Sequence, residues 1–129
     1  MAQHELELIL MRELAAHLQI PIFVVRPDGG LLFYNEPAEA LLGLRFDETG
    51  PMPIDEWVSC FAPTDVDGTP LRPEDLPLTK TARSGQPNHG DLFVRDVHGN
   101  RRHLDVTRIP LTTASGQMVG AAALFWEIP

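Results

Sequence analysis

The chain has 129 residues, which is enough for one domain with its own apolar core. Ten Lys and Arg against eighteen Asp and Glu give a net charge of −8, which argues against nucleic acid and anionic membrane surfaces as partners. The sequence has no apolar run near the roughly 20 residues of a membrane span and no basic flank of a signal peptide at its start. Because its one cysteine, Cys60, cannot form an internal disulfide, we expect a cytoplasmic protein.

Residues 1–19 are predicted to form an amphipathic helix that precedes the main domain, residues 20–129. Apolar residues between Glu5 and Gln19 recur at helical spacing, namely Leu6, Ile9, Leu10, Leu14 and Leu18. This stripe is too apolar to remain in water. We therefore expect the helix to join two copies of the chain as a homodimer, or else to pack on its own sheet.

A hairpin and a short helix are predicted next. The segments 22–26 and 31–34 are typical of strands, and the sequence PDGG between them is typical of a turn. Asn35 is suited to cap a helix, and Pro37 is harmless in the first turn because its missing amide would have no partner there. Gly43 permits a left-handed exit from this helix. The helix therefore follows directly on the second strand.

The middle of the chain, residues 47–77, contains six prolines, which predict short helical turns and loops rather than long elements. The sequence IDEWVSCF is predicted to form one such turn, and TDVDGTP a loop. A helix is expected within RPEDLPLTKTARSG despite Pro77. Three antiparallel strands are then predicted over residues 91–97, 101–111 and 117–128, and His89 and His98 are expected in loops.

Both alternating residue sets of the last predicted strand are apolar, so the sheet must be covered on both faces. The short central helices can cover one face, and the N-terminal helix or a second subunit can cover the other. The fold class expected is α+β, with a five-stranded antiparallel sheet, a flap of short helices and an N-terminal amphipathic helix.

This order of elements resembles the PAS domain family, whose members are sensory and signalling modules. The resemblance is carried by the segments PDGGLLFYNEPAEALLG, DGTPLRPEDLPLTKTARSG, DVHGNRRHLDVTRIPL and GQMVGAAALFWEI, which cover nearly all of residues 20–128. It implies a helical flap over a cavity, with the short helix after Asn35 as one wall. The candidate pocket residues are Leu41, Trp57, Phe61 and Leu78 on the helices, with Leu92 and Leu104 as the floor.

The same resemblance can be tested against the cofactors of the family. Photoreceptive members carry a flavin-reactive cysteine in an Asn-Cys-Arg-Phe-Leu-Gln type segment, whereas Cys60 lies in VSCFAP. Haem-binding members use a histidine on the helix before the last three strands, where this chain has PLTKTA. We therefore expect neither flavin nor haem, and the identity of any ligand stays open.

Three functions remain open. The first is a sensory or regulatory module, without catalysis, that binds an apolar small molecule or a signalling protein and acts through dimerisation and flanking helices. The second is a small enzyme of another α+β fold, in which Asp105 and His103 on one strand, with Asp96 close by, transfer protons. The third is a dimerisation module with a filled core. A pair of Asp and His deep in a pocket would favour the enzyme.

Overall fold

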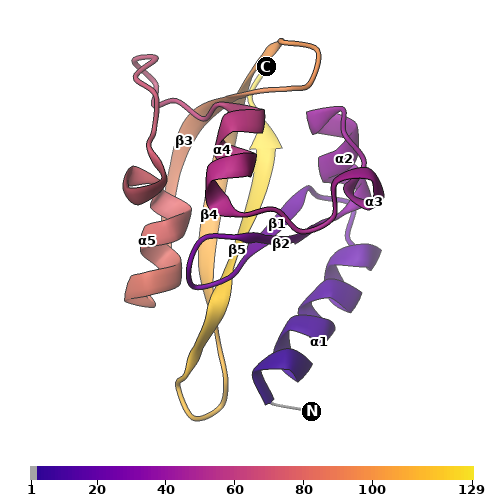
Figure 1. Ribbon diagram of the computed structural model, residues 1–129, viewed down its shortest axis with the longest axis vertical. Helices are drawn as coiled ribbons and strands as arrows, with labels where there is room; N and C mark the ends of the chain where they lie inside the picture. The colour runs from indigo at the N-terminus through magenta and orange to yellow at the C-terminus, as the bar shows by residue number, and fades with distance from the viewer. Residues whose placement is uncertain (1–2) are drawn as a thin grey trace.

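Five antiparallel strands in the order β2-β1-β5-β4-β3 form the sheet of this protein (Figure 1). The computed structural model describes residues 3–129, so residues 1 and 2 of the expected N-terminal helix lie outside the described residues. The strands are β1 (Ile22–Val25), β2 (Leu31–Tyr34), β3 (Asn88–Arg95), β4 (Arg101–Thr112) and β5 (Met118–Glu127). The expected α+β fold with an antiparallel sheet is confirmed.

The start of β3 differs from the prediction, which placed it at residue 91. The strand begins at Asn88, and His89 pairs with Thr107 of β4, so the expectation that His89 lies in a loop was wrong. Asn88 and Gly90 have low strand propensity, which hid this part of the strand in the sequence. Pairing with the long strand β4 overrides that propensity.

The helices α2 (Glu36–Leu42), α3 (Phe46–Thr49), α4 (Ile54–Phe61) and α5 (Pro77–Ser84) follow one another between β2 and β3. A short 3-10 turn, η1 (Pro73–Asp75), precedes α5. Pro77 is the first residue of α5 and does not interrupt it, because a proline needs no hydrogen-bond acceptor in the first turn. These helices are called the flap below. The main core lies between the flap and one face of the sheet.

Asn35 caps α2 as predicted, and it also ties three elements together. Its Oδ1 accepts hydrogen bonds from the amides of Ala38 at 3.3 Å and Ile22 at 2.9 Å. Its Nδ2 donates to the carbonyls of Ala15 at 3.0 Å and Ile20 at 2.9 Å. Helix α2 then ends at Gly43, whose φ of 79° is the left-handed conformation that the sequence predicts.

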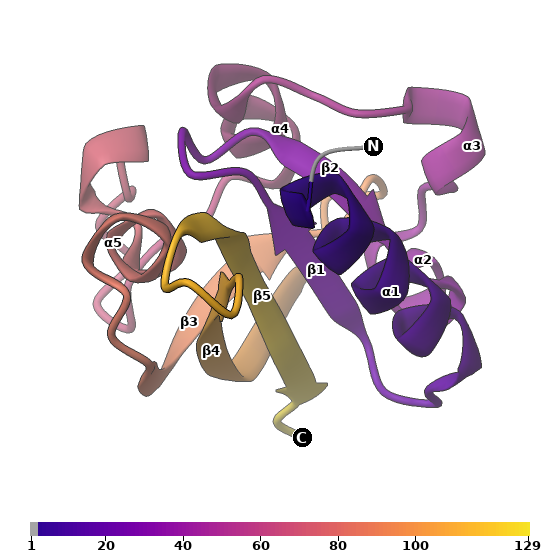
Figure 2. The ribbon, with the colours of Figure 1, turned by 90° about the horizontal axis from the view of Figure 1, so that it is seen from below.

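The helix α1 (Gln3–His17) covers the other face of the sheet, and Figure 2 shows it alongside β1 and well apart from α5. Its sheet-facing side chains differ from the predicted stripe: Leu8, Met11 and Ala15 pack against residues of β1, β4 and β5. Leu18, which follows the helix, is the one member of the predicted stripe that packs with them. Four members of the predicted stripe point to solvent instead, namely Leu6 (46% exposed), Ile9 (44%), Leu10 (56%) and Leu14 (56%). The helix is thus apolar on two sides, and the sheet occupies one of them.

Among residues 3–129, no helix is both long and apolar enough to cross a membrane.

Candidate functional site

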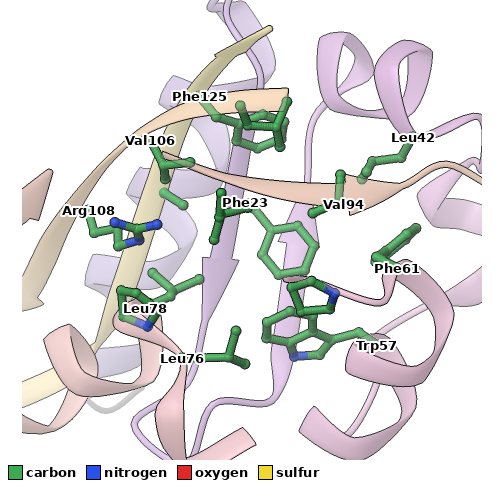
Figure 3. Close-up of a pocket in the computed structure, with 15 residues that line it drawn as sticks. Phe23, Leu42, Trp57, Phe61, Leu76, Leu78, Val94, Val106, Arg108 and Phe125 are labelled. Atoms are coloured by element: carbon green, nitrogen blue, oxygen red, sulfur yellow. The ribbon is translucent and has the colours of Figure 1, made fainter. Parts of the chain in front are cut away.

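A cavity of about 70 Å³ lies between the flap and the sheet (Figure 3). Helices α2, α4 and α5 and the loops beside them contribute one wall, and strands β1, β3, β4 and β5 contribute the other. All but one of the side chains that line it are apolar. They are Phe23, Leu42, Trp57, Phe61, Pro63, Leu76, Pro77, Leu78, Leu92, Val94, Leu104, Val106, Arg108, Ala123 and Phe125.

The structure brings five of the six candidate pocket residues together around this cavity. Trp57, Phe61 and Leu78 line it from the flap, and Leu92 and Leu104 are paired across β3 and β4 beneath it. Leu41 is the exception, because the neighbouring Leu42 takes the position on α2 that faces the cavity. Leu41 is partly buried against the edge of the core. Successive helical residues point about 100° apart, so only one of two adjacent leucines can face the same cavity.

Aromatic side chains of the flap and of β1 pack against one another at the Trp57 end of the cavity. The rings of Phe23 and Trp57 meet edge to face, with centroids 5.0 Å apart, and Phe61 packs against Phe23 at 6.4 Å. The indole Nε1 of Trp57 donates a hydrogen bond to the carbonyl of Gly29 at 2.8 Å. This bond fixes the indole between α4 and the turn that joins β1 to β2. The wall is therefore held by both packing and a buried hydrogen bond.

Arg108 is the charged residue of the lining, and sequence reasoning missed it. Its side chain is 3% exposed, and its guanidinium Nη1 donates to Oδ1 of Asn88 at 2.9 Å. Figure 3 shows it beside Val106 and Leu78, at the opposite end from Trp57 and Phe61. Strand alternation was the available signal, because Arg108 has the same parity along β4 as Leu104, which was expected in the floor.

Burial lowers the pKa of the Arg108 guanidinium from its ordinary value to about 10. The apolar surroundings disfavour the charged form, because they replace the water that would otherwise solvate it. A pKa near 10 still leaves the group protonated at neutral pH. The cavity therefore contains a buried positive charge beside an otherwise apolar lining.

The residues considered for cofactor chemistry lie outside the cavity lining. Cys60 is an exposed residue of α4 whose thiol is only partly desolvated. This partial desolvation and the charge of Glu56 raise the pKa of the thiol, which disfavours the reactive thiolate. None of the described lining residues is a histidine or cysteine. The lining therefore does not fit a flavin that reacts with a thiol or a haem held by an imidazole. Among residues 3–129, no cluster of three His, Cys, Asp or Glu side chains is arranged to hold a metal ion.

Asp and His side chains do pair, but across strands and on the other face of the sheet. His103 Nε2 lies 2.7 Å from Asp91, and His89 Nε2 lies 2.8 Å from Asp105. The pairing of His103 with Asp105 that the enzyme alternative considered is therefore not formed, because neighbours across a ladder are closer than next-but-one residues of a strand. The hydrogen bond to His103 lowers the pKa of Asp91, as expected for a carboxylate that accepts a hydrogen bond at the surface.

Asp96, the third residue of that hypothesis, supports the turn between β3 and β4. Its Oδ1 accepts hydrogen bonds from the amides of His98 and Asn100, both at 2.9 Å. Its Oδ2 lies 3.0 Å from Nη2 of Arg102. Burial raises the pKa of Asp96, but the hydrogen bonds from Asn100 and Arg102 outweigh it and bring the pKa below its ordinary value. Asp96 is thus a structural residue of the turn.

Comparison with known proteins agrees with this architecture. The family model of the PAS fold matches residues 9–127, so the chain belongs to the PAS family, whose members are sensory and signalling domains. A search of curated proteins found no match.

Solved structures with the same fold include three of different origin. The PAS domain of BvgS from Bordetella pertussis is 21% identical with a TM-score of 0.63, over 95% of this chain and 85% of that one. A LOV protein from Rhodobacter sphaeroides is 9% identical with a TM-score of 0.73, over 95% and 68%. The PAS domain of the fruit-fly ELK potassium channel is 10% identical with a TM-score of 0.68, over 94% and 96%. At these sequence identities, the similarity to the three structures shows a shared fold and nothing further.

Proposed function

We propose that this chain is a PAS sensory module that binds a small molecule in the cavity between the flap and the sheet and does not catalyse a reaction. The observation that supports this most directly is the cavity itself, which lies beneath the flap and is lined by Trp57, Phe61 and Arg108 among others. Small-molecule sites are typically concave and mostly apolar, with a few polar groups placed within them. The Asp and His pairs are partly exposed on the opposite face of the sheet and do not have this setting.

A route from the cavity to α1 supports a signalling role. Leu42 lines the cavity from α2, and the N-terminus of α2 is capped by Asn35. The same Asn35 side chain donates to the carbonyl of Ala15, near the end of α1. A ligand that prefers one position of α2 would therefore also favour one position of α1. Residues 1–19 act in this proposal as the signalling helix, and residues 20–129 as the sensor.

The output we propose is association of two copies through the exposed side of α1. Leu10 and Leu14 are both 56% exposed and lie one turn apart, beside Leu6 and Ile9. Burial of a leucine side chain contributes roughly 1.5 to 3 kcal/mol, so a second copy that covers this stripe would gain several kcal/mol. The alternative to a second copy is a signalling protein that covers the same stripe. The alternative to ligand binding in the cavity is a dimerisation module whose core is filled.

Native mass spectrometry after gentle purification tests the ligand and the oligomer together. We expect a dimer mass with an additional small molecule that is released on unfolding. Thermal unfolding of the same sample before and after extensive dialysis should then show a lower midpoint once the molecule is lost. If the mass equals that of the bare polypeptide and small apolar molecules leave the midpoint unchanged, the cavity is part of a filled core and the sensory proposal is wrong.

Sedimentation tests the dimer separately. Leu10→Glu combined with Leu14→Glu should give a monomer, because charged side chains would have to be buried at the interface. Val66→Glu is the matched control, since Val66 is 53% exposed on a loop away from α1 and its variant should remain dimeric. Removal of residues 1–18 should have the same effect as the double substitution. A parent protein that sediments as a monomer would contradict the proposed output.

A further inference from the structure

We propose that the ligand of the cavity is a small carboxylate, held through its two oxygens by the guanidinium of Arg108, with its apolar body directed toward Phe23 and Trp57. This inference rests on the proposed function, since it names the chemical class of the molecule that the cavity would bind. It stands on the placement of Arg108, its hydrogen bonds and the composition of the lining.

Arg108 has more donors than the protein uses. A guanidinium carries five N–H groups, and among the described residues its side-chain hydrogen bond is the one from Nη1 to Asn88. Among the side chains that the structure describes, no Asp or Glu forms an ion pair with it within 4.0 Å, and the described lining contains no carboxylate. A buried charge without a counter-ion is costly, which favours the arrival of an anion from outside.

The orientation of the guanidinium is set by a chain of hydrogen bonds. Nδ2 of Asn88 donates to the carbonyl of Pro77 at 3.3 Å and to Oγ1 of Thr81. Since the donor side of this amide is engaged with α5, its oxygen faces Arg108. Arg108 is thus anchored at one nitrogen to the first turn of α5, while its side chain lines the cavity. Such anchoring is what a preorganised anion site requires.

The guanidinium, the apolar lining and the small volume of the cavity together favour a carboxylate over other anions. A guanidinium matches the two oxygens of a planar carboxylate with two parallel hydrogen bonds. A phosphate group would bring additional oxygens that the apolar lining cannot satisfy, which costs free energy. At about 70 Å³ the cavity is smaller than the roughly 150 Å³ cavity that holds benzene, so the fitting acids have only a few carbons.

The two tryptophans of the chain offer a direct readout. Trp57 lines the cavity, whereas Trp126 is 44% exposed and lies outside it. In a Trp126→Phe background, indole fluorescence reports the cavity alone. We would titrate the full chain with propionate, butyrate and hexanoate, and in parallel with the corresponding neutral amides, at constant ionic strength. The titrations are repeated with Arg108→Met, which removes the charge and keeps much of the volume, and with Arg101→Met.

Arg101 is the matched control because its guanidinium lies over the ring of Phe93, 3.9 Å from the centroid, outside the described lining of the cavity. We expect at least one acid to change the Trp57 emission saturably and to bind at least about tenfold more tightly than its amide. Arg108→Met should weaken that acid about 10- to 100-fold, as expected for loss of a charge-assisted hydrogen-bond pair, and Arg101→Met should leave it unchanged.

Failure of this inference can be told apart from failure of the proposed function. If the amides bind as tightly as the acids and Arg108→Met alters neither, the cavity binds small molecules but the carboxylate inference is wrong. If neither class changes the Trp57 emission, the carboxylate inference is rejected. Absence of any bound molecule in native mass spectrometry would then reject the proposed function as well. Should Arg108→Met fail to fold, the comparison of acid with amide in the parent protein still decides.

Discussion

Arg108→Met should make the ligand-free protein more stable, which is unusual for a substitution in a core. The pKa of Arg108 falls from its ordinary value to about 10, because its charged form is buried among apolar side chains. A pKa lowered this far corresponds to roughly 3 kcal/mol of lost stability at neutral pH, since one pKa unit is worth about 1.4 kcal/mol. Loss of the hydrogen bond to Asn88 offsets about 1 kcal/mol of the stability gained by removing the buried charge. We therefore expect Arg108→Met to raise the free energy of unfolding by about 2 kcal/mol.

The pH dependence of this gain follows from the direction of the shift. Below pH 10 the arginine is charged in both the folded and the unfolded chain, so its full penalty is present. Above pH 10 the folded chain releases the proton, whereas the unfolded chain keeps it to a higher pH, so the penalty diminishes. The advantage of Arg108→Met over the parent should thus shrink by roughly 1 to 2 kcal/mol between about pH 9 and pH 11.

Tyr34 titrates in the same range with the opposite sign. Burial raises its pKa from 10.0 to about 12, so its contribution to stability is full below pH 10 and is lost as the pH rises toward 12. Both proteins contain Tyr34, and its effect cancels when the variant is compared with the parent at each pH. The difference between the two unfolding free energies therefore isolates Arg108.

Urea unfolding followed by circular dichroism, at pH values from 7 to about 11, measures these quantities. Arg101→Met is the control for loss of an arginine and should change the free energy of unfolding by less than about 0.5 kcal/mol, since its side chain is on the surface. An Arg108→Met variant that is less stable than its parent by 1 kcal/mol or more would refute the reasoning. Arg108 would then be a net stabilising member of the network with Asn88 and Thr81.

Three further predictions concern the core, the cap and the cofactor. Trp57→Ala should lower the free energy of unfolding, measured with urea, by roughly 3 to 5 kcal/mol because of the space that the side chain leaves, and Trp57→Phe by much less. A loss under 1 kcal/mol for the alanine variant would show instead that Trp57 lies in a flexible wall. Asn35→Ala should lower the free energy of unfolding by about 3 kcal/mol, because it leaves the amide of Ile22 and the carbonyls of Ala15 and Ile20 without their partner. Hydrogen exchange of the backbone amides in α1 should accelerate. Unchanged exchange would show that packing alone holds the helix. The purified protein should be colourless, since the flavin-reactive segment is lacking around Cys60 and the haem histidine is lacking in PLTKTA; an absorption band that persists near 400 nm after desalting would contradict this.

Local sequence patterns were sufficient to determine most of the fold. Asn35, Pro37 and Gly43 define α2 at both ends through interactions within a few residues, so its limits are readable from the chain. Alternation along the last three strands and the glycine-containing turns between them predict the hairpins that the sheet contains. The same alternation identified Leu92 and Leu104 as neighbours on one face of the sheet, because its period is fixed by the backbone.

Tertiary contacts decided the remaining features. Which side of α1 meets the sheet could not be read from a helix that is apolar on two sides, and packing against β1 and β5 selected Leu8, Met11 and Ala15. The start of β3 depended on its pairing with β4.

The buried charge of the cavity depends on contacts between distant parts of the chain. Asn88 and Arg108 meet across β3 and β4, and α5 supplies the carbonyl of Pro77 that orients the asparagine. Whether an arginine on a strand reaches water or becomes buried depends on what packs over that strand, and here the packing of α5 on β4 and β5 buries Arg108. Side-chain burial is a property of the assembled layers, and for that reason the charge in the cavity emerged only from the folded structure.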